Sequence, residues 1–413
     1  MATHDFYDDL EVREPAQREE ALFNALVPQL EDARKHSSYF GKLLGGIETT
    51  SIKDRSALAA LPVTRKSDLV NLQSKGDPLG GLTTVPAGKL KRIFQSPGPT
   101  YDAEGHGSDW WGTARALYAS GVRQGDIVHN TFSYHFTPAG IMLEQGAEAL
   151  GCAVFPAGVG NTDLQVQAIH DIEPTAYTGT PSFLKIILER AAEQAKDVSS
   201  LKNACVGGEG LPPALREEIE SFGIHCGQVY ASADIGSIAY ESAAREGLIV
   251  DERLIVEIVR PGTGDPVPEG EVGEVVVTVL RSDYPLIRFA TGDLSQVLSG
   301  QSPCGRTNMR LRGWMGRADQ TTKVKGMFVH PAQVAEIVKR HDEIDRARVI
   351  VTNDGTTDIM TVRCETAHGD DDELVRRINQ TIRDVCKLKG SAELAAPASL
   401  PNDGKVIEDA RDV

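Results

Sequence analysis

The stretch YPLIRFATGDLS, residues 284–295, joins an apolar run to a polar turn. The run 285–287 leads through Arg288 into a Thr291-Gly292-Asp293 turn. A turn at the end of a strand presents its carboxylate at a fixed angle, and a carboxylate accepts two hydrogen bonds from a vicinal diol such as that of a ribose. Asp293 is therefore a candidate ribose ligand. The alternative interpretation is a tight turn with a solvated aspartate.

Several motifs accompany this turn in a fixed order. Arg317-x-Asp319, Lys325-Gly326 and Gly404-Lys405 follow it, as does CGRT (304–307). Before it stand FYDDLEVREPAQREEALFNALVPQLEDARKHSSYF (6–40), LPVTRKSDL (61–69), GGEGLPPALREEIE (207–220) and YASADIG (230–236). In this order, and over nearly the whole chain, these segments resemble the adenylate-forming enzymes, most closely the phenylacetate–CoA ligase family.

Composition narrows the class of protein. A chain of 413 residues exceeds what one hydrophobic core usually supports, so we expect two domains. A net charge of −16 argues against a nucleic-acid or anionic-membrane partner. The chain has no apolar run long enough to span a membrane, its start does not resemble a signal peptide, and its six cysteines form no CxxC pair. We expect a cytoplasmic protein with reduced thiols.

The order of apolar runs predicts an α/β fold. Residues 15–45 have helical periodicity, and from 110 to 190 strand-like runs alternate with helical ones, which implies parallel βαβ units. Residues 250–300 suggest an antiparallel sheet or a small barrel-like β part. We predict a large N-terminal domain, 1–318, of βαβ units with mixed sheets, and a small α+β C-terminal domain, 319–413. The resemblance implies that the small domain is mobile, with its hinge at Asp319.

The resemblance also implies a chemistry. Enzymes of this family use ATP and Mg²⁺ to convert a carboxylic acid to an acyl-adenylate, which CoA then attacks. Lys405 looks like the lysine that approaches the α-phosphate, although an exposed tail lysine is the alternative. Arg317 would assist Asp293 near the ribose and phosphate. Lys325 and Gly326 would contact the pantetheine arm of CoA, where a glycine lets the thiol pass close to the backbone.

The adenine and metal positions fall on two glycine-containing turns. By resemblance, Gly207, Gly208 and Glu209 form the adenine-side loop, Tyr230 stacks on adenine, and Ala231 lines the same site. Asp234 takes the magnesium position that the family usually fills with Glu, so its arm is one methylene shorter. Because Mg²⁺ demands short, near-octahedral oxygen ligation, water or backbone movement must compensate for the shorter arm.

The phosphate loop departs most from the family. The family has a Ser/Thr/Gly-rich segment with a lysine, whereas this chain has RIFQSPGPTYDAEG (92–105). Ser96, Gly98 and Thr100 remain as candidate phosphate ligands. Pro97 and Pro99 each remove a backbone N–H that could have met a phosphate oxygen, and no lysine stands in the loop.

An acyl pocket is expected where FSYHFTPAG (132–140) meets the YASADIG turn. Aromatic side chains there would suit an aromatic or short apolar carboxylic acid. Core packing of a strand end is the alternative for the aromatic residues, and a structural role is the alternative for the histidine. The candidate substrate-binding residues are Phe132, Tyr134, His135, Phe136, Gly140, Ser232, Ile235 and Gly236.

Three functions remain open from the sequence. The leading hypothesis is an ATP-dependent acyl- or aryl-CoA ligase, with ATP, Mg²⁺, CoA and a small carboxylic acid as ligands and a homodimer as a possible assembly. The second is an acyltransferase that keeps the thioester half-reaction without ATP, as the altered phosphate loop suggests. The third is a non-catalytic nucleotide- or acyl-CoA-binding protein. Asp293, Arg317 and Lys405 argue against the third, because a pure binder has little need of a mobile lysine.

Overall fold

The computed structural model describes residues 6–96, 100–318, 322–353, 357–369, 371–403 and 405–411. The chain forms two compact units that interleave in sequence. Unit 1 comprises residues 1–256, 277–289 and 298–313, and unit 2 comprises 257–276, 290–297 and 314–413. The division passes through three strands, β11 (Leu254–Val259), β12 (Val272–Val279) and β13 (Phe289–Leu298), so part of each belongs to each unit. The mixed α/β architecture predicted from the sequence is confirmed.

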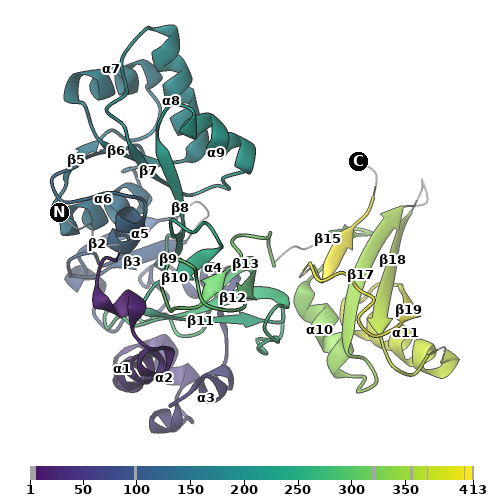
Figure 1. Ribbon diagram of the computed structural model, residues 1–413. Helices are drawn as coiled ribbons and strands as arrows, with labels where there is room; N and C mark the ends of the chain where they lie inside the picture. The colour runs from purple at the N-terminus through teal and green to yellow at the C-terminus, as the bar shows by residue number, and fades with distance from the viewer. Residues whose placement is uncertain are drawn as a thin grey trace. The chain divides into compact units, whose positions relative to one another are not determined.

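Unit 1 is organised around a mixed sheet (Figure 1). The strands β4 to β8 are parallel neighbours in the order β5-β4-β6-β7-β8, and β9, β10 and β14 extend them antiparallel. The path then continues to β13, β12 and β11. The strands of unit 1 are β1 (Thr64–Arg65), β2 (Arg92–Gln95), β3 (Tyr101–Glu104), β4 (Ile127–Asn130), β5 (Ala153–Pro156), β6 (Ala176–Gly179), β7 (Asn203–Val206), β8 (His225–Ser232), β9 (Gly236–Glu241), β10 (Leu248–Val250) and β14 (Arg310–Leu311).

Helices connect the parallel strands, as the alternation of apolar runs predicts. Their apolar faces pack on the sheet: Val166 and Ile169 from α7, and Leu184, Ile187 and Leu188 from α8, lie in one buried cluster with Tyr177 of β6. The helices of unit 1 are α1 (Pro15–His36), α2 (Ser38–Leu43), α3 (Arg55–Ala59), α4 (Leu69–Leu72), α5 (Ala114–Ala119), α6 (Ala139–Ala149), α7 (Thr162–Ile172), α8 (Pro181–Glu193) and α9 (Pro213–Glu220).

One helix is shorter than the sequence predicts. Residues 110–120 have helical periodicity, but α5 begins only at Ala114. Asp109 and Gly112 have φ values of 46° and 77°, which are incompatible with a right-handed helix. The Asp109 carboxylate accepts hydrogen bonds from the backbone N–H groups of Thr113 and Ala114, so it satisfies free donors at the helix start.

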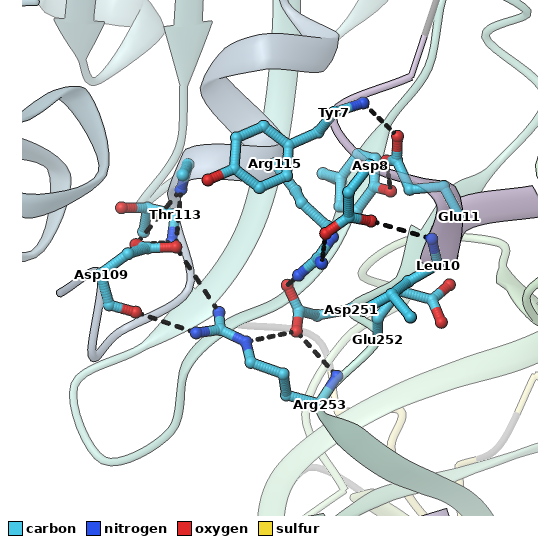
Figure 2. Close-up of polar contacts among 12 residues, drawn as sticks. Tyr7, Asp8, Leu10, Glu11, Asp109, Thr113, Arg115, Asp251, Glu252 and Arg253 are labelled. Carbon is cyan, nitrogen blue, oxygen red and sulfur yellow. Dashed lines mark hydrogen bonds and ion pairs between the residues drawn. The ribbon is translucent and has the colours of Figure 1, made fainter. Parts of the chain in front are cut away.

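A buried ionic network holds the N-terminal segment on unit 1 (Figure 2). We call it the N-terminal network. Arg18, of which 3% of the side chain is exposed, donates to Glu252 at 2.8 Å and to Thr307 at 2.8 Å. Each acid of the network forms an ion pair with an arginine. The pairs are Asp8 with Arg115, Glu11 with Arg306, Glu252 with Arg18, and both Asp109 and Asp251 with Arg253. The paired charges compensate one another where Arg18, Glu11, Asp251 and Glu252 are buried, and Asp8 and Arg253 reach the surface.

Unit 2 contains an α+β layer with its own core. Its four-stranded sheet has the order β19-β18-β17-β20, and the apolar faces of α10 and α11 pack into the same buried cluster as its strands. A two-stranded hairpin, β15-β16, precedes it. The elements are β15 (Thr322–Val324), β16 (Met327–Val329), α10 (Pro331–Lys339), β17 (Arg346–Asn353), β18 (Asp358–Glu365), α11 (Asp372–Cys386), β19 (Ser391–Ala395) and β20 (Ile407–Asp409).

Two further observations bear on the expected environment. None of the helices in the described part of the chain is long and apolar enough to cross a bilayer. The six cysteines are free, and four of them are buried.

Candidate active site

Loops at the carboxyl ends of the parallel strands bring together two of the predicted segments. The N–H of Gly207 donates to the carbonyl of Gly179 at 3.1 Å, so the loop after β7 lies beside the end of β6. A Cβ placed on Gly208 would lie 3.5 Å from the ring of Phe132, which follows β4. The predicted adenine-side loop therefore adjoins the predicted acyl segment, at the sheet edge where ligands of open α/β sheets bind.

Backbone geometry explains the glycines of this loop. A Cβ on Gly207 would come within 2.9 Å of the carbonyl oxygen of Val229, and Gly208 has a φ of 80°. Both positions therefore favour glycine. Glu209 is exposed, and its carboxylate accepts a hydrogen bond at 2.7 Å from the N–H of Ser182 in the first turn of α8. In this structure Glu209 stabilises a helix start.

The YASADIG segment forms the end of β8 and the turn into β9. The β8–β9 register shifts between Tyr230 and Ala231, both half-buried. Gly236 has a φ of 90°, and a Cβ there would clash with the carbonyl oxygen of Trp111 at 2.2 Å. Ser232 Oγ accepts a hydrogen bond from the N–H of Ile235 at 3.3 Å, which closes the turn. The turn thus fixes the backbone on both sides of Asp234.

Asp234 lies in a buried group of polar side chains that also includes the start of the phosphate loop. Its Oδ2 accepts a hydrogen bond from Lys66 Nζ at 2.5 Å. Its carboxyl group is within hydrogen-bonding reach of that of Asp102, in β3. The Oδ2 of Asp102 accepts a short hydrogen bond from Ser96 Oγ. We call Lys66, Ser96, Asp102 and Asp234 the carboxylate cluster; Asp102 and Asp234 are completely buried.

The electrostatics of the carboxylate cluster are dominated by burial and by two like charges. Burial and the neighbouring charge of Asp234 raise the pKa of Asp102 well above its usual range. Burial also raises the pKa of Tyr284, and the charges of Asp102 and Asp234 add to this effect. On the other side, Arg281 donates to the backbone carbonyl of Ile235 at 2.5 Å. Two acidic groups thus lie together beside the phosphate-loop position, and their closeness favours the protonated form of Asp102.

The acyl segment divides into buried and exposed parts. Tyr134 is half-buried, donates to Glu144 at 2.7 Å and accepts from Asn130 at 2.8 Å, and burial raises its pKa. A Cβ on Gly140 would come within 2.8 Å of the Tyr134 ring. His135 and Phe136 are exposed, and the backbone carbonyl of Phe136 accepts a hydrogen bond from Gln95, next to the phosphate loop. In the turn at 230–236, Ile235 is buried and Ser232 half-buried.

A second group of site residues lies in unit 2. Asp293 and Arg317 form an isolated antiparallel bridge, and Arg317 Nη1 donates to Asp293 Oδ1 at 3.0 Å. Trp314 Nε1 donates to the same oxygen at 3.1 Å, and 59% of this tryptophan is exposed. The side chain of Asp293 is 14% exposed. The pairing of Asp293 with Arg317, predicted from the TGD and Arg-x-Asp motifs, is present.

The remaining predicted residues of unit 2 lie on turns. Lys325 and Gly326, with φ values of 47° and 86°, form the two-residue turn between β15 and β16, where positive φ is required. Lys405 is exposed, its N–H donates to Asp403 at 3.0 Å, and it lines a cavity of about 690 Å³ together with Arg260, Lys339 and Arg348. Gly98 and the predicted hinge residue Asp319 lie outside the described residues.

Three residues of these groups were not predicted from the sequence. Lys66 stands in the segment LPVTRKSDL, and Asp102 stands directly after the phosphate loop. Position 234 holds Asp where the family usually has Glu. This was the available indication that residues such as Lys66 and Asp102 belong to the site, because a shorter carboxylate requires different neighbours. For Trp314, the only indication in the sequence is its position three residues before Arg317.

Comparison with known proteins identifies the family. The family model for AMP-binding enzymes matches residues 109–279. The chain is 31% identical to phenylacetate-coenzyme A ligase of Aromatoleum evansii, over 78% of this chain and 74% of that protein. It is 30% identical to the enzyme of the same name from Thermus thermophilus, over 80% and 77% of the two chains. The chain belongs to the phenylacetate–coenzyme A ligase family.

The solved structures agree on the fold of this ligase. A crystal structure of 2-hydroxyisobutyryl-CoA ligase in complex with 2-HIB-AMP and CoA is 23% identical, with a TM-score of 0.72, and the match covers 100% of this chain and 94% of that one. An open conformation of that protein has a TM-score of 0.73 at 24% identity, over 97% and 93% of the two chains. The family assignment makes this protein an enzyme, an AMP-forming acid–CoA ligase that uses ATP.

Proposed function

We propose that the ligase acts on an aromatic or short apolar carboxylic acid and joins it to CoA in two steps. In the first, a carboxylate oxygen of the acid attacks the α-phosphorus of ATP and pyrophosphate leaves. In the second, the CoA sulfur attacks the acyl carbon and AMP leaves. The observation that supports this proposal most is the carboxylate cluster, which joins the start of the phosphate loop to Asp234.

The residue roles follow from the contacts in each unit. In unit 1, Ser96, Thr100 and the backbone around Gly98 are our candidates for the phosphates, and Lys66 brings an ammonium group to a loop that has no lysine of its own. The glycines at 207 and 208, with Tyr230 and Ala231, are our candidates for the adenine. In unit 2, Asp293 is our candidate acceptor for the ribose diol, with Arg317 holding its carboxylate.

Asp234 is our candidate ligand for the magnesium ion that accompanies ATP. The site fits such an ion, because the Oδ1 atom of Asp234 is buried and meets no donor among the described residues. When bound, the ion would neutralise phosphate charge during the attack on phosphorus. Lys405 would add positive charge at the α-phosphate, and Lys325 with Gly326 would accept the pantetheine arm. The hinge at Asp319 remains part of this proposal.

The choice of acid rests on the aromatic side chains of the segment 132–140. The ring of Phe132 lies beside Gly208, and the ring of Tyr134 packs on Gly140. The segment 132–140 therefore carries two partly buried aromatic side chains. An aromatic or apolar acid would bury its body there. His135 and Phe136 are exposed in this structure and would contact the acid only after a local rearrangement.

One experiment separates the proposed activity from its rivals. The protein is incubated with ATP, Mg²⁺ and a panel of aryl and short aliphatic acids, with and without CoA, while AMP, pyrophosphate and thioester are measured. We expect pyrophosphate with an aryl acid alone and thioester only when CoA is added. Thioester exchange without pyrophosphate would indicate the ATP-independent acyltransferase. No turnover with any acid, together with AMP binding, would indicate a binding protein.

A further inference from the structure

The second carboxylate of the cluster, Asp102, has no role in the functions described above. It lies in β3 opposite Phe94 of β2, close to the phosphate loop, and none of its surface is exposed. A completely buried aspartate is rare unless it is paired with a positive charge or binds a metal. The side chains that meet it are those of Ser96 and Asp234, which supply one hydroxyl donor and a second carboxyl group.

The two carboxyl groups are satisfied in the same incomplete way. Asp102 uses its Oδ2 atom to accept from Ser96, and Asp234 uses its Oδ2 atom to accept from Lys66. The Oδ1 atom of each is buried and has no hydrogen-bond partner among the described residues. Buried polar atoms without a partner indicate strain, a catalytic role, or a missing water or ion.

The charges around the pair are also incomplete. Lys66 is the ammonium group bonded to Asp234, Arg281 donates to the backbone at 235, and Tyr284 is a neutral phenol nearby. Among the described residues, the two carboxyl groups therefore have one directly bonded cation, which leaves room for a further positive charge. No group of three or more Asp, Glu, His and Cys side chains suited to a metal occurs in the parts of the chain described. Mg²⁺ typically binds one or two carboxylates and takes its other ligands from water and substrate phosphates.

We propose that Asp102 is a second protein ligand of the divalent cation that enters with the nucleotide, so that Asp102 and Asp234 bind it together. The proposal rests on the proposed function. It explains how the chain tolerates Asp at position 234, since a second carboxylate supplies the oxygen that one shorter side chain cannot place. It also connects the cation to the phosphate loop, because Ser96 holds the other oxygen of Asp102.

Mn²⁺ is the probe for this site, because the electron paramagnetic resonance signal of free Mn²⁺ decreases when the ion binds. Wild type is titrated with Mn²⁺ in the presence of α,β-methylene-ATP, whose α,β bridge cannot be cleaved, so that it transfers no adenylyl group. Asp102→Asn, which keeps the shape and removes the charge, is expected to weaken Mn²⁺ binding in this complex by roughly tenfold or more. Its affinity for AMP without metal should stay unchanged. Asp68→Asn, an exposed site close to Lys66, is the matched control and should bind Mn²⁺ like wild type.

Several outcomes overturn the proposal. The first is an Asp102→Asn variant that binds Mn²⁺ as tightly as wild type does. The second is a wild-type protein that binds the nucleotide but no Mn²⁺, which would favour a proton shared between the two carboxyl groups. The double variant Asp102→Asn/Asp234→Glu restores the longer arm and should recover Mn²⁺ binding, and unchanged AMP binding by both variants shows that they are folded. A double variant as weak as the single one would assign Asp102 a structural role only. If the wild-type protein does not bind AMP at all, the proposed function itself is contradicted.

Discussion

The N-terminal network and the carboxylate cluster are two buried groups of charged residues in the same unit, and they balance charge differently. In the N-terminal network every acid forms an ion pair with an arginine. In the carboxylate cluster Asp234 is paired with a lysine and Asp102 accepts only a hydroxyl hydrogen bond, and each has an oxygen without a partner among the described residues. Balanced charge holds a segment in place, whereas unbalanced charge at a ligand-binding edge is available to a ligand. Substitutions should therefore separate stability from activity.

The largest effect is expected on stability, in the N-terminal network. Arg18→Met removes one of the two arginines that pair with the buried Glu252 and leaves Arg13 at 3.0 Å, so we expect a cost of about 3 kcal/mol, the lower end of the range for breaking a buried pair. Chemical denaturation should show this loss of unfolding free energy. Arg376→Met, in an exposed pair with Glu373, is the control and should change stability by less than about 1 kcal/mol. Equal effects of the two substitutions would contradict a structural role for the network.

Lys405 should show the opposite behaviour. The side chain is exposed, so Lys405→Ala should leave the unfolding free energy unchanged. Removing one charge aimed at developing negative charge should lower the rate of adenylate formation by roughly 10²–10³-fold. Acid-dependent pyrophosphate release measures this rate. The same variant should still convert a supplied acyl-adenylate and CoA to thioester, and equal loss of both half-reactions would contradict the assignment.

The next prediction concerns Asp293, which lies in unit 2 and not in the carboxylate cluster. Asp293→Ala removes the proposed acceptor of the ribose diol, which should weaken AMP binding by about 1.5–3 kcal/mol in free energy, as for a hydrogen bond to a charged group. Calorimetry with AMP measures the change, and 2′-deoxy-AMP should lose less affinity, because it offers one hydroxyl fewer. An unchanged AMP affinity in a folded variant would remove Asp293 from the site.

Trp314 should give the smallest effect. Its indole N–H donates to Asp293, so Trp314→Phe removes one orienting hydrogen bond and keeps an aromatic ring. We expect AMP binding to weaken by about 0.5–1.5 kcal/mol, the usual net value of one hydrogen bond. Since Trp110 and Trp111 are buried, the exposed Trp314 should also report AMP binding through its fluorescence. A loss larger than that of Asp293→Ala would mean that Trp314 contacts the nucleotide directly.

The sequence predicted those features that depend on local pattern. The strand–helix alternation from 110 to 195 and the elements after 322 appear close to their expected bounds, because each rests on periodicity and on turn residues nearby. The start of α5 differs, because Gly112 interrupts the periodic run with a positive φ and Asp109, just before the run, has one too. The Asp293–Arg317 pair was predicted from motif order.

Features that depend on tertiary proximity were not predicted. Asp102 and Asp234 are 132 positions apart, and no periodicity within either segment indicates that they meet. The pairing of Lys66 with Asp234 likewise joins a short helical turn near the N-terminus to the end of β8. The interleaving of the two units had no local signal either, because it depends on which strands neighbour one another in space.

That interleaving has a consequence for biosynthesis. Unit 1 receives its last segment, residues 298–313, only after 257–276 and 290–297 of unit 2 have been made. On a ribosome that releases the chain from its N-terminus, unit 1 cannot complete its sheet until β14 has left the exit tunnel. A chain stalled near residue 290 would expose the edge of β10 to which β14 pairs, and an exposed strand edge invites intermolecular pairing. Nascent chains of this enzyme should therefore be most dependent on chaperones in the interval before residue 313 emerges.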